Sequence, residues 1–286
     1  MPDYRFRIVN VFAEERLGGN PLVVVEDGRG LDDATMQALA LQFNVSETTF
    51  ILPSTVATAH VRIFTPTFEM PFAGHPTLGT AHVVRALANP GDSVTLEMRA
   101  GIVPVSAQGD RWTLQAKAPR TRKVDATREE LAAMLGLGTA DLGAEPLWVD
   151  TGSEQLVIPL VSSEAVRRAA PDPALVMEFG NVSPDGASAR AMAYIWAGDG
   201  DGDGKVLCRF FFPKHGAMIE DPGTGSACAN LGGWLVATGA PRPQTLALLQ
   251  GEAVSRPCYL GLTVDASGAI YVSGRVIELA RGNLSL

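Results

Sequence analysis

The chain has 286 residues, a length at which two domains are expected. Its residues are 46% hydrophobic and 19% charged, a balance that excludes a disordered chain and is typical of a globular protein. Its formal net charge of −8 provides no basic stripe to neutralise phosphates, so neither nucleic acid nor an anionic membrane is an expected partner. No apolar run has the length of a signal peptide or a membrane span, so we expect a cytoplasmic protein.

In the first part of the chain, strand-like and helix-like stretches alternate. Residues 7–12 and 21–25 are rich in β-branched residues and predict strands. Residues 32–43 begin with an aspartate and place apolar side chains at helical spacing, which predicts a helix. Residues 45–52 and 61–66 predict two further strands.

A loop at 71–75 then leads into a predicted helix at 76–88. Because small and apolar residues cover nearly all of its faces, this helix is expected to lie in the centre of a domain. The second half of the chain follows the same order, with a helix predicted between the halves. The expected elements are a helix at 125–137, a strand at 206–213, a loop at 219–225 and a helix at 226–238.

Two short sequence echoes indicate an internal duplication. Arg62-Ile-Phe-Thr-Pro66 resembles Arg209-Phe-Phe-Phe-Pro213, and residues 46–53 resemble residues 153–159 in the same order. We therefore expect an α+β fold of two similar domains, each a curved sheet wrapped around one buried helix. Residues 118–120 are the expected hinge.

The two loop-to-helix junctions are candidate anion sites, because a helix begins with unpaired N–H groups and a positive dipole end. Gly74 and His75 stand at one junction, and Gly225 and Ser226 at the other. Glycine lets the backbone approach a ligand closely. A single junction of this kind is more often only the end of a strand, but two matched junctions favour a small carboxylate as ligand.

Glu47 is the candidate acid/base. In an extended segment it shares a face with Val45 and Ile51, and burial there would raise the pKa of its carboxyl group toward neutrality. A solvent-facing strand glutamate is the simpler alternative. Glu154 occupies the echoing position in the second half, and the pattern alone does not choose between the two.

His75, Asp221 and Ser226 are weaker candidates. A histidine at a helix start is commonly a cap or a core hydrogen-bonding group, and an aspartate before a proline is commonly a cap. Their places at the two expected anion sites make them candidates for substrate contact.

Other motifs argue against cofactors. Asp199, Asp201 and Asp203 resemble the start of a calcium loop, but Phe210 stands where a glutamate is required. No dinucleotide-binding, Walker or GxSxG motif occurs. We therefore expect neither a metal nor an organic cofactor. Four histidines and three cysteines lack metal-ligand or disulfide spacing: His60, His75, His82, His215, Cys208, Cys228 and Cys258.

Several motifs in one order resemble the phenazine-biosynthesis (PhzF-like) isomerase family. They are Gly19-Asn-Pro21, Ser46-Glu-Thr-Thr-Phe50, Arg62-Ile-Phe-Thr-Pro66, Pro71-Phe-Ala-Gly-His-Pro-Thr-Leu-Gly79, Glu220-Asp-Pro-Gly-Thr-Gly-Ser-Ala227 and, more weakly, Gln250-Gly-Glu-Ala-Val-Ser-Arg-Pro257. The last departs from the family's Gly-Arg-Pro-Ser, which bears on the identity of the substrate.

The resemblance implies a diaminopimelate-epimerase-like fold, namely two pseudo-symmetric domains with mostly antiparallel, barrel-like sheets around central helices. The implied domains are 1–118, with about 275–286 crossing back to it, and 119–274. It also implies a homodimer and an active site between the domains. The implied activity is a cofactor-independent proton shift on a small cyclic or unsaturated carboxylic acid of the dihydro-hydroxyanthranilate type.

The resemblance also implies roles for the candidate residues. Glu47, rather than Glu154, becomes the general acid/base, and His75, Asp221 and Ser226 contact substrate. The backbone at Gly74 and Gly225 receives the carboxylate.

Related racemases carry a cysteine at each helix start, where this chain is expected to have Ala73 and Asp221. A two-thiol racemase is therefore disfavoured. The open alternatives are an epimerase or racemase of a small amino or hydroxy acid that uses Glu47 with another acid, and a non-catalytic metabolite-binding homologue.

Overall fold

A computed structural model describes residues 3–182, 190–198, 204–214 and 216–286. The chain forms two units, residues 1–115 with 273–286 (unit 1) and residues 116–272 (unit 2). The aspartate series at 199–203 lies outside the described residues.

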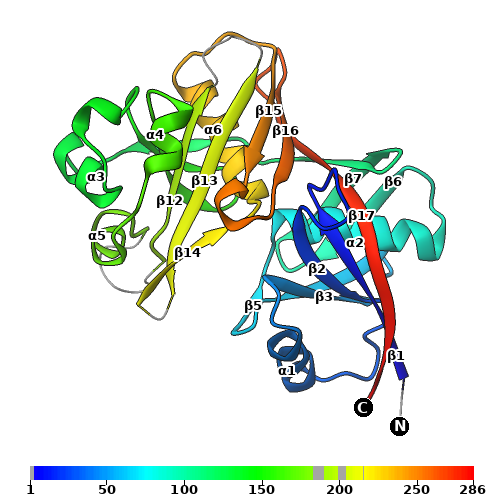
Figure 1. The fold of residues 1–286 in the computed structure, drawn as a ribbon. Coiled ribbons are helices and arrows are strands. Elements are labelled where there is room, and N and C mark those ends of the chain that lie inside the picture. The colour runs from blue at the N-terminus through cyan, green and yellow to red at the C-terminus, as the bar shows by residue number, and fades with distance from the viewer. Residues whose placement is uncertain (1–2, 183–189, 199–203, 215) are drawn as a thin grey trace. The chain divides into compact units, whose positions relative to one another are not determined.

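Unit 1 is a barrel of mostly antiparallel strands. Its pairings run from β1 through β2, β3, β4, β6, β7 and β8 to β17, which pairs with β1 and closes the ring. The two chain ends therefore lie side by side on β1 and β17 (Figure 1). The strands are β1 (Asp3–Val11), β2 (Asn20–Val25), β3 (Glu47–Leu52), β4 (Ala59–Phe64), β5 (Glu69–Met70), β6 (Ser93–Met98), β7 (Gly101–Gln108), β8 (Arg111–Gln115) and β17 (Ile270–Ser285).

Helix α2 (Gly74–Ala88) packs against most of the barrel strands, as its small and apolar sequence predicts. Helix α1 (Asp33–Phe43) lies against β3 and β4 and begins at its cap Asp32, whose carboxylate accepts a hydrogen bond from the amide of Thr35. Strand β3 is buried on both faces. Phe50 packs with the α1 core, whereas Thr49 hydrogen bonds to Thr80 of α2.

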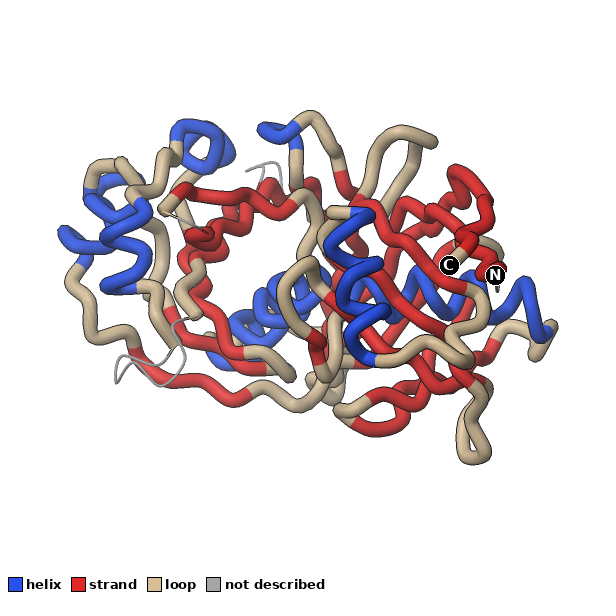
Figure 2. Tube along the Cα trace, turned by 90° about the horizontal axis from the view of Figure 1, so that it is seen from below, coloured by secondary structure: helices blue, strands red, loops and turns tan. Residues whose placement is uncertain are grey.

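Unit 2 repeats the design around helix α6 (Gly225–Ala237), and its strands curve around a helix in Figure 2. Helices α3 (Arg128–Met134), α4 (Ser163–Arg168) and α5 (Pro173–Phe179) share a second apolar core with β11 and β12. The strands are β9 (Arg120–Lys123), β10 (Leu147–Asp150), β11 (Glu154–Pro159), β12 (Ala193–Gly198), β13 (Lys205–Lys214), β14 (Ala217–Asp221), β15 (Gln244–Gln250) and β16 (Cys258–Val264).

The expected duplication is visible in the strand pairing. The order β1–β2–β3–β4–β6–β7 alternates antiparallel and parallel pairs, and β10–β11–β12–β13–β15–β16 repeats that alternation. The two Arg-x-Phe-x-Pro motifs hold equivalent places. Arg62 pairs with Glu69 and lies over the ring of Phe64, while Arg209 pairs with Glu220. The guanidinium of Arg209 likewise lies over the Phe211 ring.

The predicted equivalence of residues 46–53 and 153–159 is wrong. The topology matches β3 with β12, and it matches β11, which begins at Glu154, with β2. Phe50 faces Arg62 and Ile195 faces Arg209, so by count Glu47 corresponds to Met192. Glu154 is therefore not the structural equivalent of Glu47.

Two expected boundaries also differ. Residues 219–225 are not all loop, because residues 217–221 form β14 and pair with β13. The helix expected at 125–137 is the shorter α3, which begins at the capping box of Thr127 and Glu130. The expected helices at 32–43, 76–88 and 226–238 are confirmed, with ends that shift by one or two residues.

Candidate active site

Glu47 and His75 form a buried pair in unit 1. Glu47 is the first residue of β3 and His75 the second of α2, and Glu47 Oε2 lies 3.3 Å from His75 Nε2. Their side chains are only 15% and 6% exposed. Glu47 lies on the face of β3 that carries Thr49, so its surroundings are partly polar, and Val45 precedes the strand.

His75 is neutral at physiological pH. Burial lowers its pKa from 6.5 to about 3, and a hydrogen bond to the backbone of Pro21 opposes this shift only in part. The close approach to Glu47 is therefore that of a neutral imidazole to a carboxyl group rather than an ion pair with an imidazolium.

Asn20, in the Gly19-Asn-Pro21 motif, holds the other side of the imidazole. Its Nδ2 lies 3.4 Å from His75 Nδ1, and its Oδ1 accepts a hydrogen bond from Ser46 Oγ. Gly19 makes this placement possible, because its φ of +78° is left-handed and a Cβ there would lie 2.7 Å from the Val11 carbonyl oxygen. The motif was visible in the sequence, but it predicted no role for Asn20.

The two central helices differ from the other helices in their caps. Side chains of Asp32, Thr127, Ser162 and Asp172 accept hydrogen bonds at the starts of α1, α3, α4 and α5. In contrast, the N-cap residues of α2 and α6 are Ala73 and Thr224, and the side chain of neither accepts a hydrogen bond from a first-turn amide. The first-turn amides of α2 and α6 thus lack the side-chain acceptor that the other helices have, which suits an anionic ligand.

Asp221 is not at the helix start, contrary to expectation. It is the last residue of β14, and its Oδ2 accepts a hydrogen bond from Thr224 Oγ1 at 2.5 Å. Because Ala73 and Thr224 are the N-caps of α2 and α6, Thr224 is the counterpart of Ala73. Asp221 instead shapes the turn that leads into α6.

Gln250, from the weak motif near the C-terminus, holds the same turn. Its fully buried side chain donates from Nε2 to the Asp221 carbonyl oxygen and to Thr224 Oγ1, and its Oε1 accepts from the Thr224 amide. Gly251 packs against the turn so tightly that a Cβ would lie 2.5 Å from the Pro222 carbonyl oxygen. The Gln-Gly pair therefore fixes the geometry at the start of α6.

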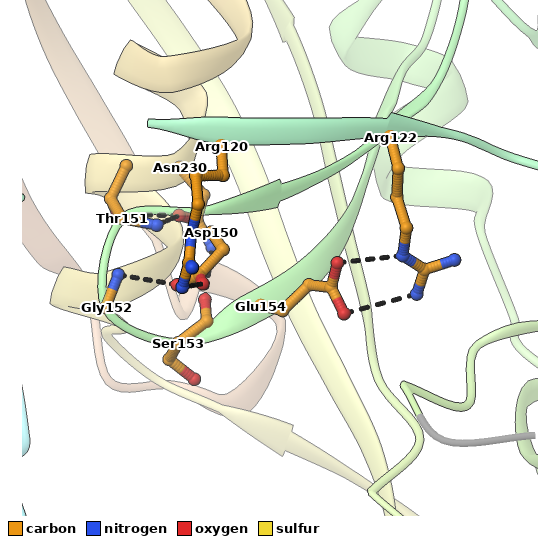
Figure 3. A network of polar contacts seen from close by, with 8 residues as sticks. All are labelled: Arg120, Arg122, Asp150, Thr151, Gly152, Ser153, Glu154 and Asn230. Carbon is orange, nitrogen blue, oxygen red and sulfur yellow. Dashed lines mark hydrogen bonds and ion pairs between the residues drawn. The ribbon is translucent and has the colours of Figure 1, made fainter. Parts of the chain in front are cut away.

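Ser226, the second residue of α6, joins a buried polar network. Gln155 Nε2 donates to Ser226 Oγ at 2.9 Å, and Gln155 Oε1 accepts from Asn230 Nδ2. Figure 3 shows Asn230 reaching from α6 to the turn between β10 and β11, where it contacts Thr151 and Ser153. Sequence reasoning missed Gln155 and Asn230, because isolated amides carry no motif.

Glu154, also shown in Figure 3, is engaged elsewhere. Both of its carboxylate oxygens accept hydrogen bonds from Arg122, and its side chain is 25% exposed. Fixed by a guanidinium, this carboxylate is a structural ion pair.

The thiols are buried, and none stands at the N-cap of α2 or α6. The three cysteines are free, and burial raises the pKa of each, that of Cys208 to about 12. Cys228 is the fourth residue of α6 and Cys258 begins β16, so neither N-cap position carries a thiol. Among the described residues, no three acidic, histidine or cysteine side chains lie close enough together to hold a metal ion.

In the described part of the chain, no helix is both long and apolar enough to cross a lipid bilayer. Fold and residues together define an α+β enzyme of two repeated units, with a carboxyl–imidazole pair in one and a hydroxyl at the helix start of the other.

The family model described as phenazine biosynthesis-like protein matches residues 9–282, so the chain belongs to this family. The chain is 39% identical to an uncharacterized isomerase of Pasteurella multocida over 98% of its own length and 94% of that protein. It is 32% identical to trans-2,3-dihydro-3-hydroxyanthranilate isomerase of Pseudomonas aeruginosa, covering 99% of this chain and 100% of that one.

The fold has a similar solved structure, a phenazine biosynthesis protein of the PhzF family from Bacillus anthracis. That structure has a TM-score of 0.86 and 24% identity, and the match covers 100% of both chains. The expected fold class is thereby confirmed, and the chain is an enzyme of the isomerase class.

Proposed function

We propose that this isomerase moves a proton on a small cyclic or unsaturated carboxylic acid, without a cofactor, and that Glu47 is the general acid/base. The buried contact between Glu47 and neutral His75 is the observation that carries this proposal. A carboxyl group in such surroundings is poorly hydrated, which favours proton exchange with carbon over exchange with solvent. The substrate class follows from the relatives named as trans-2,3-dihydro-3-hydroxyanthranilate isomerases.

In the proposed reaction the Glu47 carboxylate removes a proton from one substrate carbon. The C–H bond breaks and a Glu47 O–H bond forms, while the C–H electron pair forms a new double bond to the adjacent carbon and the former π pair moves to the far carbon. The same proton is then returned to another carbon of the displaced π system, which regenerates the carboxylate. Atoms and electrons balance within the substrate and Glu47, so the step requires no oxidant or reductant.

The remaining residues have binding roles in this proposal. His75 orients Glu47, and Asn20 orients His75. The first-turn amides at Gly74 and Gly225 receive the substrate's carboxylate and the charge that develops on it, as helix starts without side-chain caps are suited to do. His75, Asp221 and Ser226 also contact the substrate.

Racemisation through two thiols is a poorer explanation of this chain. The N-cap residues Ala73 and Thr224 carry no sulfur, and the pKa of the buried Cys228 thiol is raised. A thiolate able to take a proton from carbon is therefore lacking at both helix starts.

The test uses Glu47→Gln, with Glu154→Gln as matched control. With trans-2,3-dihydro-3-hydroxyanthranilate as substrate, Glu47→Gln should lower kcat by about 10²–10⁴-fold, the usual contribution of a general acid/base. Glu154→Gln should leave kcat nearly unchanged, because it removes only a partly exposed ion pair. Turnover by Glu47→Gln at the wild-type rate would refute the role of Glu47.

Isotope transfer separates the proton shift from epimerisation. In H2O, substrate deuterated at the reacting carbon should retain part of its label in the isomerised product when one carboxyl group carries the proton. Product that keeps the carbon skeleton and double bonds of the substrate but has an inverted stereocentre would instead identify an epimerase.

A further inference from the structure

The polar network behind Ser226 has a hydrogen-bond direction that the backbone dictates. The Thr151 amide can only donate, so the atom of Asn230 that it meets at 2.9 Å must be oxygen. The Ser153 carbonyl can only accept, so the atom that it meets at 2.8 Å must be nitrogen. The orientation of the Asn230 amide is therefore fixed.

Asn230 uses all four of its hydrogen-bonding positions. Oδ1 accepts from the amide and from the hydroxyl of Thr151, and Nδ2 donates to Ser153 O and to Gln155 Oε1. The side chain is fully buried, so reversing it would leave a backbone donor and a backbone acceptor unpaired in the interior.

The orientation of the Asn230 amide in turn fixes the orientation of the Gln155 amide. Because Asn230 donates to Gln155 Oε1 at 2.8 Å, the nitrogen of Gln155 must be the atom that faces Ser226. Gln155 is 3% exposed and its Nε2 donates to Ser226 Oγ at 2.9 Å. The serine oxygen therefore acts as acceptor toward the protein, and its hydroxyl hydrogen must be donated elsewhere.

We propose that Asn230 and Gln155 are positioning residues that fix Ser226 as a hydrogen-bond donor to the carboxylate of the bound acid. Ser226 is partly exposed at the start of α6, where a ligand can reach its hydroxyl group. A serine that instead donated to Gln155 would present lone pairs to an anion and repel it. The identity of the ligand rests on the proposed function, whereas the direction of the network does not.

The decisive variant is Gln155→Glu, which keeps the shape of the side chain but makes it an acceptor only. A carboxylate can still accept from Asn230, and it would draw the Ser226 hydroxyl hydrogen toward itself, so the network stays satisfied while its direction is reversed. Because the new charge also repels an anion, the effect must be measured in two backgrounds, wild type and Ser226→Ala.

The probe is 3-hydroxyanthranilate, a stable aromatic acid with the polar groups of the relatives' substrate, titrated by calorimetry. Ser226→Ala should weaken its binding about tenfold, the usual effect of losing a hydrogen bond to a charged group. Gln155→Glu should weaken binding about tenfold more in the wild-type background than in Ser226→Ala. Equal effects in both backgrounds would mean that Gln155 does not act through Ser226, which overturns the proposal.

Gln37→Leu is the matched control for loss of an amide. Gln37 Nε2 donates to the Thr65 carbonyl oxygen at 2.8 Å in unit 1, so this variant removes a comparable bond outside the network. Binding of the probe should not change. Gln155→Leu, which removes the donor without adding charge, should weaken binding in the wild-type background and have little effect in Ser226→Ala.

A second readout needs no ligand. With ¹⁵N-labelled glutamine, the side-chain NH₂ resonances of Gln155, assigned by their loss in Gln155→Leu, should move in Ser226→Ala because Nε2 loses its acceptor. Unchanged resonances would overturn the proposed direction. If the probe binds to no form of the protein while these resonances move, the proposed substrate class fails and the inference about the network stands.

Discussion

The starts of α2 and α6 share the same backbone arrangement but carry different side chains. Both helices follow a strand hairpin that carries an Arg–Glu pair, and both lack a side-chain cap. Their second residues differ: His75 contacts the carboxyl group of Glu47, while Ser226 meets the neutral amide of Gln155. The two helix starts therefore present different chemical groups, an imidazole in unit 1 and a hydroxyl group in unit 2.

The same divergence appears at the sixth residue of each helix. In α2 this residue is Gly79, where a Cβ would lie 2.6 Å from Leu22 Cδ2, so the helix touches the sheet directly. In α6 it is Asn230, which ties the helix to the β10–β11 turn through four hydrogen bonds. One helix is held by close packing and the other by a buried polar side chain.

Replacing these two residues should have the largest effects on stability. Asn230→Ala leaves the buried polar groups of Thr151, Ser153 and Gln155 without their hydrogen-bond partner. It should lower the free energy of unfolding by more than about 3 kcal/mol. Gly79→Ala forces a methyl group into a filled space and should cost about 1–3 kcal/mol. Urea denaturation measures both. A smaller loss for Asn230→Ala than for Gly79→Ala would contradict the comparison.

Placing the last residue of β6 at the equivalent position of β15 should have a smaller effect on stability. Met98 ends β6 and Gln250 ends β15, and only Gln250 holds the turn before its helix. Gln250→Met fills a similar volume but removes the three hydrogen bonds to the turn, so it should lower stability by about 2 kcal/mol. It should also raise KM more than it lowers kcat, because the proposed function assigns substrate binding to this turn. Steady-state kinetics checks this split, and a loss confined to kcat would contradict it.

The buried imidazole predicts a pH dependence specific to unit 1. Above pH 6.5 His75 is neutral in both folded and unfolded chains and contributes no pH dependence. Between pH 6.5 and about 3 the unfolded chain binds a proton that the folded chain does not, so stability falls as pH falls, by up to about 1.4 kcal/mol per pH unit.

His75→Gln is the control for this dependence, since glutamine does not titrate. The difference in unfolding free energy between the wild type and this variant should shift against the wild type by about 2 kcal/mol from pH 6.5 to pH 5. Thermal or urea unfolding at the two pH values measures it. A difference that stays constant would show that His75 gains its proton in the folded protein at its ordinary pKa.

Much of the fold was predictable from the sequence, because it depends on local patterns. The buried character of α2 follows from its small and apolar residues, and the start of α1 follows from Asp32. The duplication was predictable from the Arg-x-Phe-x-Pro motifs. The second echo misled because Ser-Glu followed by apolar residues fits any buried strand, and only strand pairing shows that β11 corresponds to β2.

The sequence by itself therefore determined the class of fold, the two glycine-rich helix starts and the choice of Glu47 and His75 as candidates, because motif and periodicity are properties of neighbouring residues. Only the tertiary structure decided which side chains meet. The contacts of Glu47 with His75, of Gln155 with Ser226 and Asn230, and of Gln250 with Thr224 join residues far apart in the chain. Hydrogen-bond direction is a property of such contacts, and no local pattern encodes it.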